Sequence, residues 1–242
     1  MKKLILALLV TLFGLTMTWG DTNTVVEPTE KFEWGAGLLS VRGNHYRGSD
    51  QAKNWIIPTP YFTYTSEVLE VEPSFARGTF YKNDWLALKM SVIVGLNVES
   101  EKNKARAGMD SLDYMFELGP MAIVKIWESE TKGHSLTFEM PFRMVNSTDL
   151  TNAHNRGFFS ISYINWRAAP HPSRWNWGFE LSAGAMWGSR KYHEYFYGVA
   201  PWFETPERSA YKATSGFSGT QITLILNKRW QDLLFVPFLR YD

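Results

Sequence analysis

The sequence of 242 residues contains no cysteine. A chain without cysteine cannot form a disulfide, and it cannot carry the lipid-modified cysteine that anchors a lipoprotein. The sequence also lacks a long apolar run. Residues 4–15 are apolar apart from Thr11 and Gly14, but a membrane-spanning helix needs about 20 apolar residues. No later segment resembles such a helix, which argues against an inner-membrane location.

A strong charge of either sign is also missing. Lys2 and Lys3 are the only charged residues before Asp21, so their removal would change 25 basic and 24 acidic residues into 23 and 24. The resulting net charge of −1 argues against a nucleic-acid partner.

The N-terminus has the features of a secretory signal peptide. A basic start is followed by the apolar residues 4–15, and Thr18 and Gly20 supply the small residues that a signal peptidase needs. A transmembrane anchor is the alternative, but it requires a longer apolar run. We therefore expect cleavage before Asp21. The expected division is a signal peptide at 1–20, an N-terminal periplasmic segment at 21–32 and a transmembrane β-barrel at 33–242.

Strict alternation of apolar and polar residues is the most informative pattern after the signal. Apolar residues occupy the even positions of residues 135–144, from Leu136 to Met144, and mostly polar residues occupy the odd ones. Successive side chains of a strand point to opposite faces, so this segment predicts a strand with one apolar face. The same pattern predicts further strands at 55–66, 68–78, 85–97, 112–127, 157–167, 175–188, 219–230 and 233–241.

Long amphipathic strands in an exported chain predict an antiparallel transmembrane β-barrel of the bacterial outer membrane, with the apolar face toward lipid. Aromatic residues make up 16% of the chain, as expected for the aromatic girdles of such barrels. A soluble β-sandwich also has alternating strands. However, most of these strands reach ten residues or more, and their charges fall on the inner face.

The connections fall into two groups, which predict the two ends of the barrel. Short segments at 81–84, 128–132, 169–173 and 231–232 are expected to be periplasmic turns, and longer segments at 98–111, 146–156 and 189–218 are expected to be outer loops. This assignment leaves residues 33–41 as an extra strand, so either they do not span or one strand is miscounted. We expect about ten strands, and ten or twelve in a complete protein, because the chain stops at Asp242 without a terminal aromatic residue.

Charged residues on the inner faces are candidates for a pore lining or for a salt-bridged plug. They are Lys89, Asp113, Glu117, Lys125, Glu139, Arg143 and Glu180. The interior of a barrel of about ten strands is narrow enough for side chains to fill it largely, which favours the plug.

Catalytic chemistry has little support in the sequence. The histidines are His45, His134, His154, His171 and His193, and they show no metal-ligand spacing. His154 and His193 lie in expected outer loops near Asp149, Ser160 and Glu194, so a Ser–His or Asp–His hydrolase site at the rim is an alternative. No motif fixes a nucleophile beside a base, and solvated loop histidines are the simpler interpretation. We expect no cofactor.

An aromatic cluster in the last expected outer loop is a candidate interaction surface for a protein or a sugar. Its members are Tyr192, Tyr195, Phe196, Tyr197, Trp202 and Phe203. An interface girdle with a loop folded over the rim is the alternative.

Several short motifs resemble the MipA/OmpV family. Residues 192–199, followed by Tyr211 and Gly216, are similar to its Tyr-Phe-Gly-Val element, although Tyr197 is an extra residue within it. Residues 43–50 and 58–61 resemble its first glycine-tyrosine loop and its proline-containing strand. Residues 117–120 and 237–241 fit as well. The family usually continues to another, aromatic-terminated strand, so the resemblance agrees with a truncated sequence.

The resemblance implies an outer-membrane scaffold that links a murein hydrolase, a lytic transglycosylase, to a peptidoglycan synthase, with outer-membrane lipid as its surroundings. It implies no enzymatic activity and therefore no catalytic residues. A small porin-like channel or an adhesin is the alternative that other family members suggest.

Overall fold

The computed structural model describes residues 31–72, 75–95, 97–131, 133–170 and 176–242. The expected signal peptide, most of the expected periplasmic segment and His171 lie outside these residues. In the described part of the chain, no helix is long and apolar enough to cross a membrane.

The described residues form an antiparallel sheet of 12 strands. The strands are β1 Lys31–Asn44, β2 Ala52–Thr65, β3 Leu69–Glu72, β4 Phe75–Lys82, β5 Leu86–Gly95, β6 Tyr114–Glu128, β7 His134–Thr148, β8 Ala153–Ala168, β9 Gly178–Gly188, β10 Gly216–Trp230, β11 Leu233–Phe235 and β12 Phe238–Tyr241. Neighbours in sequence pair with each other from β1 to β11, whereas β12 pairs with β10. One α-helix, α1 Arg190–Tyr197, and three short 3₁₀ helices, η1 Ser100–Lys102, η2 Lys104–Arg106 and η3 Pro201–Phe203, lie in the loops.

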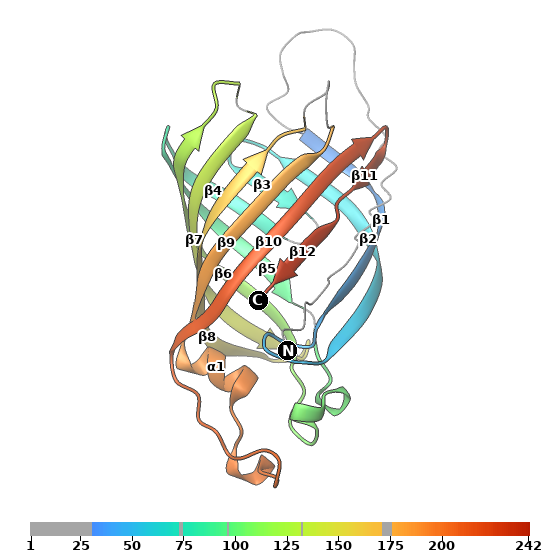
Figure 1. The fold of residues 1–242 in the computed structure, drawn as a ribbon, viewed down its shortest axis with the longest axis vertical. Coiled ribbons are helices and arrows are strands. Elements are labelled where there is room, and N and C mark those ends of the chain that lie inside the picture. The colour runs from blue at the N-terminus through green and yellow to red at the C-terminus, as the bar shows by residue number, and fades with distance from the viewer. Residues whose placement is uncertain (1–30, 73–74, 96, 132, 171–175) are drawn as a thin grey trace.

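The sheet curls into a barrel (Figure 1). Its two edges meet at a seam, where the ladders of the described strands do not join β1 to β10 or β12. Side chains bridge this seam instead. The Arg229 guanidinium of β10 donates to the Glu33 carboxylate of β1 over 2.6 Å, and Arg47 lies 3.5 Å from Asp242.

The barrel is apolar outside and polar inside, and β7 shows this arrangement most clearly. Met140, Phe142 and Met144 are 45%, 50% and 39% exposed, whereas Glu139 and Arg143 are only 5% and 6% exposed. A soluble sheet would bury the first group and expose the second. The predicted all-β fold with a lipid-facing apolar surface is therefore confirmed.

One expected strand is a hairpin. Residues 68–78 were expected to form a single strand, but β3 and β4 pair with each other, with Glu72 opposite Phe75. This additional strand explains why residues 33–41 remained as an extra strand in the sequence-based count. β1 is a full strand of 14 residues and begins at the end of the barrel that carries the short turns. The last expected strand is also divided, into β11 and β12, because Pro237 has no N–H for the ladder, although its carbonyl still accepts from the backbone N–H of Leu226.

The two ends of the barrel differ as the connections predicted. The loops at 97–113 and 189–215, with all the described helices, lie at one end, and short turns lie at the other (Figure 1). The loop expected at 146–156 is shorter than predicted, because β7 and β8 remain paired up to Thr148 and Ala153. Asp149 closes the turn by accepting hydrogen bonds from the backbone N–H groups of Thr151 and Asn152, and these bonds lower its pKa well below the usual range.

Candidate functional site

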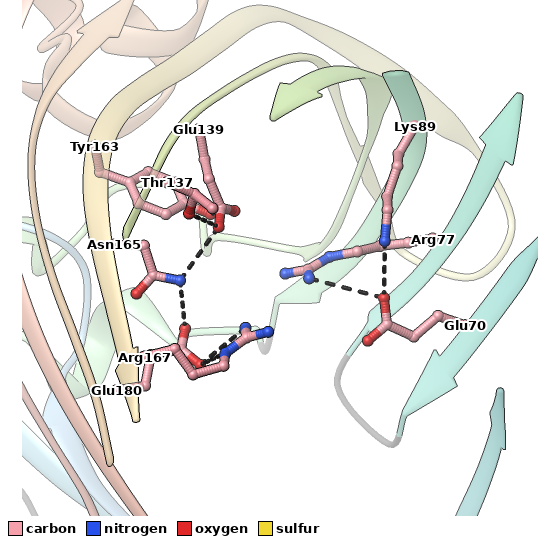
Figure 2. Close-up of polar contacts among 9 residues, drawn as sticks. All are labelled: Glu70, Arg77, Lys89, Thr137, Glu139, Tyr163, Asn165, Arg167 and Glu180. Carbon is pink, nitrogen blue, oxygen red and sulfur yellow. Dashed lines mark hydrogen bonds and ion pairs between the residues drawn. The ribbon is translucent and has the colours of Figure 1, made fainter. Parts of the chain in front are cut away.

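A hydrogen-bonded group of side chains lines one wall of the lumen near the short turns, and Glu139 is its centre (Figure 2). The Glu139 carboxylate on β7 accepts from Tyr163 at 2.8 Å, from Thr137 at 2.9 Å and from Asn165 at 3.2 Å. Tyr163 and Asn165 lie two residues apart on β8, so both point to the inner face. This carboxylate is buried but accepts from three donors, which offset the cost of burying its charge.

Asn165 extends this group to β9. Its amide nitrogen also donates to Glu180 at 3.1 Å, and the Arg167 guanidinium binds the same carboxylate at 3.0 Å. Both amide hydrogens of Asn165 are thus directed at carboxylates, and its Oδ1 has no partner among the described residues.

The opposite wall carries a second charged group, from three neighbouring strands. Glu70 on β3 lies 3.3 Å from the Lys89 ammonium on β5 and 3.9 Å from the Arg77 guanidinium on β4. Figure 2 shows the two groups facing each other across the lumen. They contribute to the lining of a cavity of about 400 Å³ near the short turns.

Deeper in the barrel, Arg143 and Glu117 form a buried ion pair. The guanidinium lies 3.7 Å from the carboxylate, and its Nε donates to Ser91 at 3.1 Å. These residues come from β7, β6 and β5, which pair side by side. The arrangement can neutralise charge and stiffen the wall.

The lumen charges predicted from the sequence pair mostly along the wall. Glu117 and Glu180 bind arginines on neighbouring strands, and Lys89 binds Glu70 two strands away. Lys125 bonds to Glu128 on its own strand, where both are partly exposed. Asp113, at the other end, lies 3.6 Å from Arg156.

Side chains from α1 close the lumen at the loop end. Tyr192 is 4% exposed and packs with Val145, Phe159 and Met186, with its ring stacked on Phe159 at 4.8 Å. The Arg47 guanidinium lies over the Phe159 ring, 4.9 Å from its centroid, and donates to the Tyr192 hydroxyl. Burial raises the pKa of Tyr192 far above its usual value.

Three loops, 45–51, 97–113 and 189–215, join above this cluster, and we call them together the cap. Buried Arg106 donates to the carbonyl of Phe196 at 2.8 Å. Arg208 donates to the carbonyls of Ala105 and Ala107 at 3.0 Å. Asn103, which is fully buried, donates to Ser49 at 2.9 Å. Each of these bonds links two different loops.

The aromatic cluster predicted as an interaction surface belongs mainly to the cap. Tyr192 is buried, and Tyr195, Phe196 and Tyr197 are half-buried on α1. The Tyr195 hydroxyl accepts from the backbone of Asp113, and burial raises the pKa of Tyr195. Phe203 is also half-buried, whereas Trp202 is 79% exposed.

The histidines occupy different environments. His45 contacts Asn103 within the cap, and burial together with nearby Lys53 lowers its pKa. His134 stacks on Trp166, and His154 lies in the β7–β8 ladder. His193 is buried between Thr214 and Ser218. The described part of the chain contains no cluster of three or more His, Cys, Asp or Glu side chains that could hold a metal ion.

The neighbours predicted for His154 and His193 have other partners. Ser160 donates to the carbonyl of Pro141, and Glu194 accepts from the backbone of Ala213. Sequence reasoning missed Ser218, which lies 25 residues after His193. The available signal was its place between Gly216 and Gly219 at the start of an expected strand.

Comparison with known families gives one match, to the family described as MltA-interacting protein MipA, over residues 35–242. No curated protein and no solved structure matches the chain.

Proposed function

This chain belongs to the MipA family, and on that premise we propose that it is a scaffold of the outer membrane. In this role it holds a murein hydrolase, a lytic transglycosylase, together with a peptidoglycan synthase during cell-wall remodelling. The family match carries the proposal, because it covers nearly all of the described barrel and the family is described by its interaction with MltA. The proposal includes export by a signal peptide that is cleaved before Asp21.

The barrel interior supports a binding role over a transport role. Glu117 pairs with Arg143 on the inner wall, and the cap covers the loop end with the buried Tyr192. Such an interior stabilises the wall but does not offer a wide aqueous path. A porin-like channel is therefore the weaker candidate.

The short-turn end is the proposed docking face, since the expected topology places it in the periplasm. Trp85 lies in the turn before β5 and is 58% exposed. Trp202 is 79% exposed at the opposite end. Exposed aromatic residues are frequent anchors of protein interfaces, so these two tryptophans form a matched pair for testing which end binds.

The experiment is a pull-down with the folded full chain in detergent micelles against periplasmic murein hydrolases and synthases. We expect retention of both enzyme classes, weaker retention by Trp85→Ala, and unchanged retention by Trp202→Ala. A loss with Trp202→Ala alone would transfer the docking face to the loop end. Failure of the unaltered chain to retain either class would refute the scaffold role.

A further inference from the structure

The His193 ring is held so that one nitrogen faces a serine hydroxyl. Its Nδ1 lies 2.6 Å from the carbonyl oxygen of Thr214, and its Nε2 contacts the Ser218 hydroxyl. A carbonyl can only accept a hydrogen bond, so in neutral His193 the proton is on Nδ1. The lone pair of Nε2 is then directed at the Ser218 O–H, which is the arrangement of a general base beside a nucleophile.

The backbone around this pair fixes its geometry. His193 is on α1, whose N-terminus is capped by the Ser189 hydroxyl. Gly188 leaves room for the ring, because a Cβ there would overlap Nε2. The Thr214 carbonyl, bonded to Nδ1 of His193, acts as the orienting group that serine nucleophile sites need for their base.

Ser218 lies in a β-bulge. The β9–β10 ladder pairs Phe217 with Trp187 and Gly219 with Met186, so its register passes over Ser218. Gly219 has a φ of 110°, which favours glycine. Bulges re-aim side chains and are common beside active sites, and this one turns Ser218 toward His193.

The pair opens into a cavity beside the lipid-facing surface. The cavity has a volume of about 340 Å³ and is lined by His193, Ser218, Tyr197, Tyr211 and Phe217, among others. Phe217 is 57% exposed, and its ring packs edge-on against exposed Trp187 at 5.6 Å. Aromatic residues on the outside of a barrel mark the membrane interface, so an acyl chain can reach this cavity from the lipid.

We propose that Ser218 and His193 form the nucleophile and general base of an esterase site for acyl esters at the membrane surface. Ser218 Oγ attacks the ester carbonyl while His193 Nε2 takes its proton. The ester C–O bond breaks, and the alcohol leaves with that proton. Water then attacks the acyl-serine, with His193 again taking and returning a proton, which releases the carboxylic acid and restores Ser218. This activity is independent of the proposed scaffold role.

The test uses the folded full chain in detergent micelles and a fluorophosphonate, which labels activated serines covalently. We expect one labelled site, found at Ser218 by peptide mass spectrometry. Ser218→Ala should abolish labelling, and His193→Gln should slow it by about 10²-fold or more, the usual contribution of a general base. Ser215→Ala alters another serine of the same cavity and serves as the matched control.

Hydrolysis of p-nitrophenyl esters is the second readout, with a preference for longer acyl chains that Phe217→Ala should reduce. Retention of the heat-modifiable barrel band on gels shows that each variant is folded. The absence of labelling on the folded unaltered chain, or equal labelling of the Ser218→Ala and Ser215→Ala variants, would overturn the proposal. Binding of murein enzymes by Ser218→Ala is expected to remain unchanged.

Discussion

Glu117 and Arg143 face each other inside the barrel with 3.7 Å between carboxylate and guanidinium, and their side chains are only 16% and 7% exposed. A charge in such a position depends on its partner, because removing one member leaves the other buried without compensation. The pair therefore contributes to barrel stability only as long as both residues are present.

Arg143→Ala should lower the free energy of unfolding by about 3–5 kcal/mol, because it leaves the buried Glu117 carboxylate without its charge partner. Urea titration of the barrel in lipid vesicles measures this change. Lys102→Ala, which breaks an exposed ion pair with Glu99, should cost about 0–1 kcal/mol. Adding Glu117→Gln to Arg143→Ala should recover part of the loss, and no recovery would contradict the pairing.

The closed interior leads to a prediction about transport. Because the cap covers the loop end and the Glu117–Arg143 pair lines the lumen, we expect little or no conductance from the folded chain in planar bilayers. Barrels with 16 or more strands leave an aqueous channel, and this sheet has 12 strands. Large, steady, ion-selective steps would refute the closed interior and favour the porin alternative.

Lipid exposure along β5 and β7 should alternate with a period of two residues. Met90 and Val94 on β5 are 43% and 68% exposed, whereas Ser91 is 1% exposed. Single cysteines can be placed at each position of the two strands without background, since the chain has none of its own. Reagents in the lipid phase should label even positions, and uniform labelling from water on both faces would contradict the barrel.

The cap should open when its arginines are removed. Arg106→Ala leaves the carbonyls of Phe196 and Asp110 without their donor, and each unsatisfied buried group costs about 1–3 kcal/mol. We expect faster cleavage by chymotrypsin within residues 189–215. Arg190→Ala removes an exposed arginine of α1 and should have no such effect. Equal cleavage of both variants would show that Arg106 does not hold the cap.

The sequence predicted the strands best where lipid determines the pattern. On β7 each outward position must be apolar, so alternation is strict and the face assignment was correct. The β3–β4 hairpin was missed because alternation continues through it, even though Pro73 argues against an unbroken strand. The divided last strand was missed for a similar reason at Pro237.

The sites were harder to predict because long-range contacts assemble them. Tyr192 and Phe196 are four residues apart, a helical spacing that was available but uninformative in a chain dominated by strands. Their burial depends on Phe159 and Met186, which come from β8 and β9. The Ser218–His193 contact depends on a bulge that shifts one residue out of register, and a bulge has no reliable sequence pattern.

The bonding of the cap arginines has a consequence for how this protein can evolve. Arg208 donates to the carbonyls of Phe203, Ala105 and Ala107, and Arg106 donates to those of Phe196 and Asp110. Every amino acid offers the same backbone carbonyl. The side chains at the acceptor positions can therefore change without breaking these bonds. The two arginines cannot drift, because lysine lacks their forked donors. The loops of the cap can thus change their exposed side chains while the closure beneath them is inherited intact.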